Sequence, residues 1–281
     1  MRRLLTAGVC LAAVATATAG CSGSGGSGTA SSSAPATSPT APTASPTAAP
    51  RPPRPRSGAC YRLTYDQAVA PTTERGPVGC GRAHTATTYL VGELDTVVDG
   101  HLLAVDAARV QDQVAEECPA RLGRFLGATP AQLRLTSLRA VWFSPTLEQA
   151  DTGQSWFRCD VIALAREGRL ASLDGRLAGA LRTPDGRRRF GICGTARPDA
   201  PGFARVICSA PHTWRALTSY DVKGDAYPGG AALQTAAQAP CQAAAKAVAA
   251  DPLDYEWGYD WPTREQWLAG QHYGLCWAPD A

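Results

Sequence analysis

The cysteines constrain the fold of this chain more than any other feature, because they recur in the same order in two halves. The residues after Gly58 hold eight cysteines in two sets of four: Cys60, Cys80, Cys118 and Cys159, then Cys193, Cys208, Cys241 and Cys276. Residues 145–159 and 262–276, which end at the last cysteine of each set, align without a gap and are identical at seven of fifteen positions. The second cysteine of each set begins a Cys-x3-His segment, with His84 and His212. This self-similarity predicts two tandem copies of one module of about a hundred residues.

Each copy has the same expected order of elements. Apolar residues at three- or four-residue spacing predict helices over 107–125 and 231–250, in which Pro119 and Pro240 are expected to kink or break the chain. Runs rich in β-branched and aromatic residues predict strands, among them 85–94, 213–222 and 253–261. The predicted fold is therefore α+β, with two tandem disulfide-stapled modules that each hold a small antiparallel sheet and one covering helix. Residues 58–165 and 190–281 form the modules, and the Gly/Arg-rich residues 166–189 form the linker.

An even number of cysteines in an exported chain is typical of a disulfide framework. Eight cysteines allow about 105 pairings, and the same pattern within both copies leaves about three. Short loops close most easily, which favours the first cysteine with the second and the third with the fourth. The favoured bonds are Cys60–Cys80, Cys118–Cys159, Cys193–Cys208 and Cys241–Cys276, and the other two patterns stay open.

The first 57 residues are typical of export and tethering. Arg2 and Arg3 precede a short apolar run, and the segment Thr18-Ala19-Gly20-Cys21 resembles a bacterial lipobox. We expect residues 1–21 to be a lipoprotein signal peptide, with lipidated Cys21 anchoring the protein to the outer face of the cell membrane. The alternative is cleavage after Ala19, which releases a soluble secreted protein. Residues 22–57 are almost entirely Ser, Thr, Pro, Ala and Gly, which predicts a disordered tether.

Charge argues against a nucleic-acid partner. Five of the 27 basic residues and none of the 24 acidic residues precede Gly58, so the remainder carries a net charge of −2. A protein that binds nucleic acid needs a basic face that displaces counterions from phosphates.

Catalytic and metal-binding motifs are also missing from the sequence. It contains no G-x-S-x-G, H-E-x-x-H or P-loop motif, and we expect no cofactor. A Cys-x3-His segment supplies two ligands where a structural zinc site needs four, so we expect no metal either. The alternative is an envelope hydrolase or metal-dependent enzyme with a site near His212.

The candidate binding surface is aromatic. Tyr255, Trp257, Tyr259 and Trp261 alternate with smaller or acidic residues, which places four rings on one face of a strand. With Trp267 and Trp277 they could form a platform for a cell-wall glycan or an envelope protein. The alternative is that this face belongs to the core of the second module. No feature of the sequence fixes the oligomeric state.

The segments Gly58-Ala59-Cys60-Tyr61, Val78-Gly79-Cys80-x3-His84 and Gly153-x5-Cys159 resemble the septum formation domain of actinobacterial envelope proteins. The second copy matches this pattern through Cys208-x2-Pro211-His212 and Trp267-x2-Gly270-x5-Cys276, while the first departs from it at Ala83 and Ala150. The resemblance implies a link to division or the cell envelope and carries no molecular activity with it. We therefore expect a non-enzymatic binding or scaffolding role in septum formation or cell-wall assembly.

Overall fold

The computed structural model describes residues 54–280. The predicted signal peptide (1–21), the lipidation site Cys21 and residues 22–53 of the predicted tether lie outside the described residues. At the end of the tether, Arg54 forms an ion pair with Glu93 and donates to the carbonyl oxygen of Gly92 at 3.0 Å. Within 54–280, no helix has the length and apolar character needed to cross a membrane.

The chain alternates short strands with two long and several short helices. The first half contains β1 (Cys60–Tyr61), α1 (Tyr65–Val69), β2 (Ala86–Glu93), β3 (Val97–Val98), β4 (His101–Leu102), α2 (Ala108–Leu126), α3 (Pro130–Arg134), β5 (Leu138–Phe143), α4 (Leu147–Asp151) and β6 (Trp156–Arg166). The middle holds β7 (Arg169–Leu170), the 3-10 helix η1 (Ala180–Arg182) and α5 (Pro184–Arg189). The second half contains β8 (Ile192–Gly194), β9 (Arg205–Ile207), β10 (Trp214–Asp221), α6 (Gly230–Val248), β11 (Gly258–Asp260), α7 (Arg264–Leu268) and β12 (Tyr273–Pro279).

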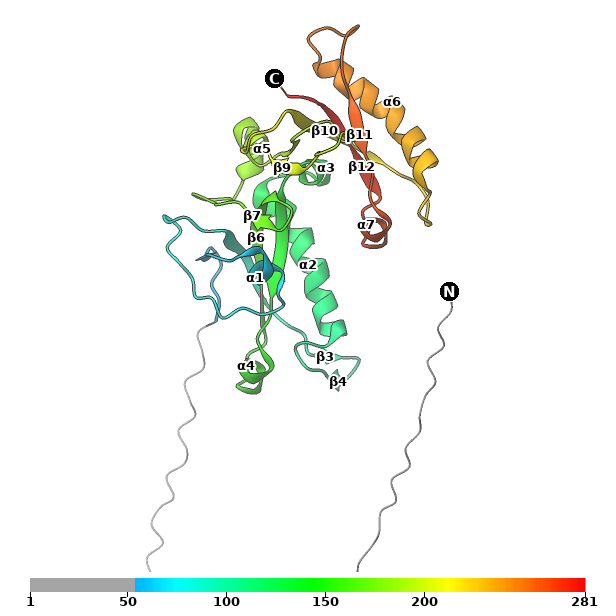
Figure 1. The fold of residues 1–281 in the computed structure, drawn as a ribbon. Coiled ribbons are helices and arrows are strands. Elements are labelled where there is room, and N and C mark those ends of the chain that lie inside the picture. The colour runs from blue at the N-terminus through cyan, green and yellow to red at the C-terminus, as the bar shows by residue number, and fades with distance from the viewer. Residues whose placement is uncertain (1–53, 281) are drawn as a thin grey trace, which may run out of the picture. The chain divides into compact units, whose positions relative to one another are not determined.

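Strands from both halves form one antiparallel sheet of ten strands (Figure 1). Its main path runs β1-β2-β6-β9-β8-β10-β12-β11, and β5 and β7 also pair with β6. The halves are joined where Arg166 of β6 pairs with Val206 of β9. The mixed helix and antiparallel sheet agree with the predicted α+β class, but the prediction of two separate modules is wrong, because their strands share this sheet.

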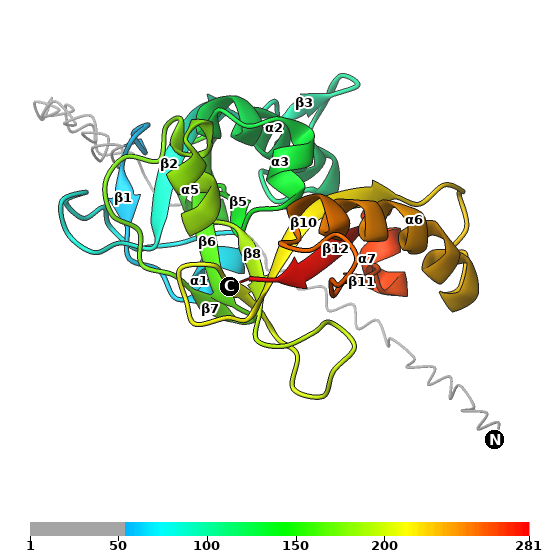
Figure 2. The ribbon, with the colours of Figure 1, turned by 90° about the horizontal axis from the view of Figure 1, so that it is seen from above.

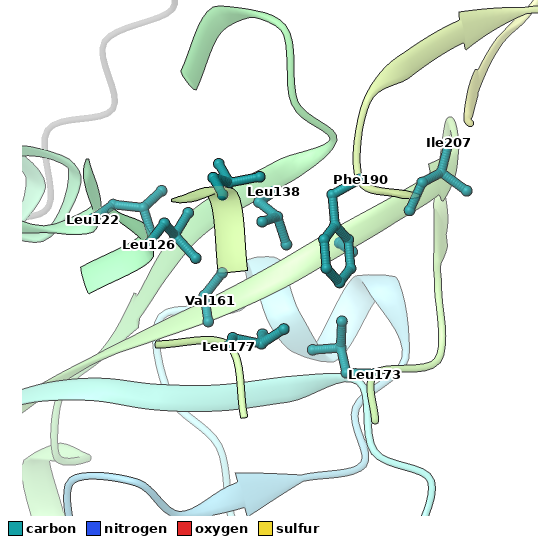
Figure 3. Packing of buried hydrophobic residues seen from close by; sticks show 10 residues of the cluster. Leu122, Leu126, Leu138, Val161, Leu173, Leu177, Phe190 and Ile207 are labelled. Atoms are coloured by element: carbon teal, nitrogen blue, oxygen red, sulfur yellow. The ribbon is translucent and has the colours of Figure 1, made fainter. Parts of the chain in front are cut away.

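A shared apolar core explains why the halves are not separate. Leu173, Leu177 and Leu181 lie in the stretch predicted to be a linker, and each is at most 2% exposed. They pack with residues of α2, β5 and β6 from the first half. They also pack with Phe190, which follows α5, and with Ile207 of β9 in the second half (Figure 3). Residues 166–189 therefore contribute to the core, and their leucines at four-residue spacing are the sequence signal for this.

The two long helices bury one face each against the sheet. The buried residues of α2 recur every four positions, from Val110 to Leu126, and those of α6 do so from Leu233 to Ala245. In Figure 2, α6 lies along β10, β11 and β12, which it also contacts. Pro119 and Pro240 were predicted to kink or break the two helices, and both helices continue through them without a break. A proline inside a helix costs about 3 kcal/mol, and the buried faces and a disulfide in each helix offset this cost.

The four disulfides pair the first cysteine with the second and the third with the fourth in each half. They are Cys60–Cys80, Cys118–Cys159, Cys193–Cys208 and Cys241–Cys276, the pattern that loop length favoured. Two of the bonds fasten the long helices to the sheet, α2 to β6 and α6 to β12. Each bond contributes about 2–4 kcal/mol by restricting the unfolded chain.

Candidate functional site: the aromatic edge strand and the His212 cluster

Three aromatic residues form a continuous file beside the last strand of the sheet. The ring centroids of Trp257 and Tyr259 lie 5.7 Å apart, and those of Tyr259 and Trp261 lie 5.6 Å apart, with both pairs inclined by 30°. Alternate residues of an extended segment point to the same side, which brings these rings together. We call Trp257, Tyr259 and Trp261 the aromatic file. Strand β11 is shorter than the predicted 253–261, so Tyr255, which is half-buried, and Trp257 precede it.

Exposure is greatest at the Trp261 end of the aromatic file. Trp257 and Tyr259 are half-buried and pack against the core beneath α6, whereas Trp261 is 38% exposed. Trp257 stacks on Tyr259, and Tyr259 lies tilted against Trp261, so this arrangement differs from a flat platform of four open faces. Trp261 is therefore the ring of the file that offers most contact area to a ligand.

A groove of about 340 Å³ follows this edge of the sheet. One side is Gly258 to Trp261, and the other is the loop segment 197–199. Because β11 ends the strand order and pairs with β12, no strand within residues 54–280 lies beside its other edge. Unpaired backbone groups at such an edge can accept an added strand or another hydrogen-bonding ligand.

Asp260 fixes β11 from the opposite face. Its Oδ2 accepts hydrogen bonds from Trp277 Nε1 at 3.0 Å and from Arg205 Nη2 at 2.7 Å, and its Oδ1 accepts one from the backbone N–H of Leu275 at 3.2 Å. Burial raises the pKa of Asp260 above its ordinary value, and Arg205 opposes part of that rise. As the sequence predicted, Asp260 points to the side of the strand opposite Tyr259 and Trp261. On that side its carboxylate is surrounded by hydrogen-bond donors.

Trp267 does not belong to the candidate surface. It is 2% exposed, and its ring stacks on His272 at 4.2 Å and meets Tyr227 edge-on at 5.9 Å. Trp277 is fully buried as well, so the prediction that Trp267 and Trp277 contribute to a binding platform is wrong. The place of Trp267 in the first turns of α7, which Thr263 and Gln266 cap, directs it into the core beneath α6.

The first half carries a reduced form of the aromatic file. Trp142 of β5 pairs with Cys159, as Tyr259 of β11 pairs with Cys276. The positions of Trp257 and Trp261, two residues before and after Tyr259, are occupied in the first half by Ala140 and Ser144. The aromatic surface is therefore specific to the second half of the chain.

The second candidate region surrounds His212. Its Nε2 lies 2.8 Å from Oδ2 of Asp280, and its Nδ1 lies 2.6 Å from the carbonyl oxygen of Ala210. Arg215 donates to the same Asp280 oxygen through Nε at 2.8 Å and Nη2 at 2.6 Å. Burial acts to raise the pKa of Asp280, but the hydrogen bonds from Arg215 and His212 outweigh it and place the pKa below its ordinary value. One carboxylate oxygen of Asp280 thus contacts both the imidazole of His212 and the guanidinium of Arg215.

The cysteine beside this cluster, Cys193, is disulfide-bonded and is not a free thiol. Cys193, His212 and Asp280 place their ligand atoms within 4.8 Å of one another, but Cys193 forms a disulfide with Cys208. A metal-binding cysteine must be a free thiolate. The two remaining ligand atoms already face each other, and Arg215 occupies the carboxylate as well. The group is therefore built as an ion-pair cluster.

His84, the counterpart of His212, is fully buried. Its Nδ1 lies 2.9 Å from the carbonyl oxygen of Arg82, so each histidine faces the carbonyl two residues before it. The position of Asp280, four residues after the last cysteine, is taken by Ala163 in the first half. In both Cys-x3-His segments the cysteine is therefore disulfide-bonded, and Nδ1 of the histidine contacts the backbone carbonyl two residues before it.

Two cavities escaped prediction from the sequence. One, of about 760 Å³, lies between the loop at residues 71–74 and α4, and the exposed acids Glu74, Asp106 and Glu148 line it. The other, of about 420 Å³, is lined by three arginines from two parts of the chain. Residues far apart in sequence form both, and the run Arg187-Arg188-Arg189 is the one local signal for the second.

These features define a disulfide-bonded α+β protein with an aromatic sheet edge. The family model described as septum formation matches residues 138–276, which is just under half of the chain. The match starts at the first residue of β5 and ends at Cys276 in β12, so it spans the join between the halves. No curated protein and no solved structure shows significant similarity to the chain.

Proposed function

We propose that this chain is an extracytoplasmic lipoprotein of the bacterial cell envelope that takes part in septum formation by binding, without catalysis. The septum formation match over 138–276 supports the link to division. Four disulfides favour an oxidising compartment outside the cytoplasm. The lipobox-like segment ending at Cys21 supports anchoring at the outer face of the membrane, and release as a soluble protein is the alternative.

The two halves are proposed to be tandem copies of one septum-formation-like module, as in actinobacterial envelope proteins. Both halves repeat the order of a long helix, a strand, a short helix and a last strand. Both fasten the long helix to that last strand by a disulfide. Thr146 with Gln149 and Thr263 with Gln266 form the same capping box before it.

Binding is assigned to the aromatic file because it combines a well-anchored base with an exposed end. Trp261 stands at a groove along the free edge of β11, while Trp257 and Tyr259 fix the file to the core. Large amphipathic rings held in place in this way contribute strongly to binding at low conformational cost. The partner is a cell-wall glycan, which stacks on aromatic faces, or an envelope protein that adds a strand to β11.

The alternative function is an envelope hydrolase or metal-dependent enzyme near His212. The observation in its favour is the 2.8 Å contact between His212 and Asp280, which is the geometry of a general base with its orienting carboxylate. Against it, Arg215 shares the carboxylate oxygen, and a disulfide holds the adjacent sulfur.

Cosedimentation of the exported full-length protein with purified cell-wall sacculi, and with envelope membranes, tests the proposal. Trp261→Ala should weaken binding about tenfold or more, whereas Leu268→Ala, which removes a side chain that is 76% exposed in α7, should leave it unchanged. Release of soluble wall fragments by the wild type, lost in a folded His212→Ala variant, would instead favour the hydrolase.

A further inference from the structure

A cavity with an unusual lining lies where three segments of the chain meet. It has a volume of about 420 Å³ and is bordered by residues 132–136 at the end of α3 and just after it, by the η1–α5 segment and by residues 215–217 of β10. Arg187, Arg188 and Arg215 line it, and no aspartate or glutamate is among its lining residues. We call this cavity the arginine pocket.

The three guanidinium groups keep an excess of positive charge. Arg187 Nη1 donates to the carbonyl oxygens of Leu181 and Arg182, both at 2.9 Å, and takes part in no ion pair within residues 54–280. Arg188 pairs with Asp185 at the exposed surface, and Arg215 uses Nε and Nη2 on one oxygen of Asp280. Three cations therefore face two carboxylates, which leaves one positive charge for a ligand.

A fourth cation lies beside the arginine pocket. Arg139 Nη1 donates to the carbonyl oxygens of Thr136, which lines the pocket, and of Leu138, the latter at 2.8 Å. Burial lowers the pKa of Arg139, an effect opposed by Tyr273 and increased by Arg205. In the described part of the chain Arg139 forms no ion pair, and a half-buried charge without a partner has a desolvation cost. An anion in the neighbouring pocket would reduce that cost.

The remaining lining and the rigidity of the walls define the class of ligand. Leu135, Leu181 and Leu217 contribute an apolar part to the lining of the pocket. The walls are held together by backbone hydrogen bonds from Ser137 to Phe190 at 2.7 Å and from Ile192 to Leu135 at 3.0 Å. A guanidinium fork matches the oxygens of a phosphate, and a preformed site loses little entropy when it binds.

We propose that the arginine pocket binds a phosphate ester whose ester arm is apolar. The anionic oxygens lie against Arg187, Arg188 and Arg215, and the arm lies against the leucines. The phosphate is carried by a membrane phospholipid or by a soluble or wall-linked ester, and both present the same chemistry to the pocket. Because the pocket joins the two halves, its ligand also stabilises the shared sheet.

The test uses the exported full-length protein and dibutyl phosphate as the probe, with inorganic phosphate and butyrate for comparison. Phosphorus NMR line broadening and the thermal unfolding midpoint should both show saturable binding that weakens as salt is added. Arg188→Gln, which removes a largely exposed side chain, should weaken binding about tenfold, and Leu217→Glu should abolish it. Arg169→Gln on exposed β7 makes the same change in net charge and should have no effect.

Several results would overturn the proposal. These are no saturable binding of dibutyl phosphate, equal losses in Arg188→Gln and Arg169→Gln, or tighter binding of butyrate than of dibutyl phosphate. Vesicles of phosphatidylglycerol then identify the source, with phosphatidylcholine vesicles as the control. Vesicle binding that Arg188→Gln and Leu217→Glu both remove supports the phospholipid, and dibutyl phosphate binding without vesicle binding supports the soluble or wall-linked ester. None of these variants touches the aromatic file, so failure here leaves the proposed function standing.

Discussion

Tyr220 of β10 lies directly opposite Gly274 of β12, and the tyrosine ring occupies the space that a side chain at Gly274 would need. The Tyr220 hydroxyl passes this glycine and donates to the carbonyl oxygen of Asp260 in β11, 2.8 Å away. In the first half the corresponding pair is Gly92 of β2 and Phe157 of β6, with the aromatic residue and the glycine exchanged between strands. In each half, an aromatic side chain on one strand thus packs over a glycine directly opposite it on the neighbouring strand.

This pairing predicts that Gly274→Ala destabilises the protein by about 2 kcal/mol. A Cβ at position 274 would lie 2.4 Å from the Tyr220 ring and 2.3 Å from the Asp260 carbonyl oxygen. Urea denaturation measures the effect, and Gly76→Ala, which meets no atom within 4 Å, is the control. Equal stability of the two variants would show that Tyr220 does not hold β11 in the way described.

The shared core predicts that Leu177→Ala destabilises the whole protein by about 2–5 kcal/mol. Leu177 lies in the stretch between the halves and is 2% exposed, so its removal leaves a cavity that both halves border. Thermal unfolding followed by fluorescence should keep a single transition, shifted to lower temperature. Leu102→Ala, at a side chain that is 79% exposed, should leave the midpoint unchanged. Two separate transitions in the wild type would contradict a common core.

The two tryptophans of the second half should behave in opposite ways. Trp267→Ala removes a buried ring and should cost about 3–5 kcal/mol, whereas Trp261→Ala should cost less than about 1 kcal/mol. Trp267→Phe keeps most of the ring and removes a buried indole N–H that has no hydrogen-bond partner among residues 54–280, so it should be much milder than Trp267→Ala. Chemical denaturation of the three variants checks this order. A larger loss from Trp261→Ala than from Trp267→Ala would reverse the assignment of core and surface.

A buried carboxyl group predicts a specific dependence of stability on pH. Burial raises the pKa of Asp160 to about 6, against the opposing effects of Arg158 and the Thr88 hydroxyl, which donates to Asp160 at 2.6 Å. A carboxyl whose pKa is raised in the folded state favours folding most at low pH, and that contribution is lost as pH rises through about 6. The free energy of unfolding of the wild type relative to Asp160→Asn should therefore fall by on the order of 2–3 kcal/mol from pH 4 to pH 7.

Urea denaturation of both proteins across this pH range measures the difference directly. All other titratable groups are the same in the two proteins, so their effects on the free energy of unfolding cancel. The pH dependence of the difference is therefore due to Asp160. A difference that stays constant, or that grows with pH, would mean that the Asp160 carboxyl is not held in a raised-pKa state.

Local patterns predicted the parts of this fold that depend on nearby residues. The four-residue spacing of Val110, Val114 and Cys118 was enough to predict α2, and loop length gave the disulfide pairing that the structure contains. The join at Arg166 and Val206 was not predicted, because a single pairing between strands 40 residues apart leaves no local pattern. The predicted helix break at the prolines was wrong for a similar reason. The free-energy cost of a proline in a helix can be recognised from local sequence, whereas the disulfides and buried faces that offset it are long-range.

The candidate site shows the same division. Alternation placed Trp257, Tyr259 and Trp261 on one side of the chain, and that holds in the structure. It could not show that the rings stack on each other, nor that the short α7 turns Trp267 into the core. The arginine pocket was missed because Arg215 reaches it from a strand far from Arg187 in sequence.

The measurement that tests the central claim most directly is the position of the full-length protein in dividing cells that lack the native copy. The wild type and Leu268→Ala should be exported and concentrated at the septum, whereas Trp261→Ala should be exported in equal amount and spread over the envelope. Septal enrichment of Trp261→Ala equal to that of the wild type would contradict binding through the aromatic file. A wild-type protein spread evenly over the envelope would contradict the role in septum formation itself.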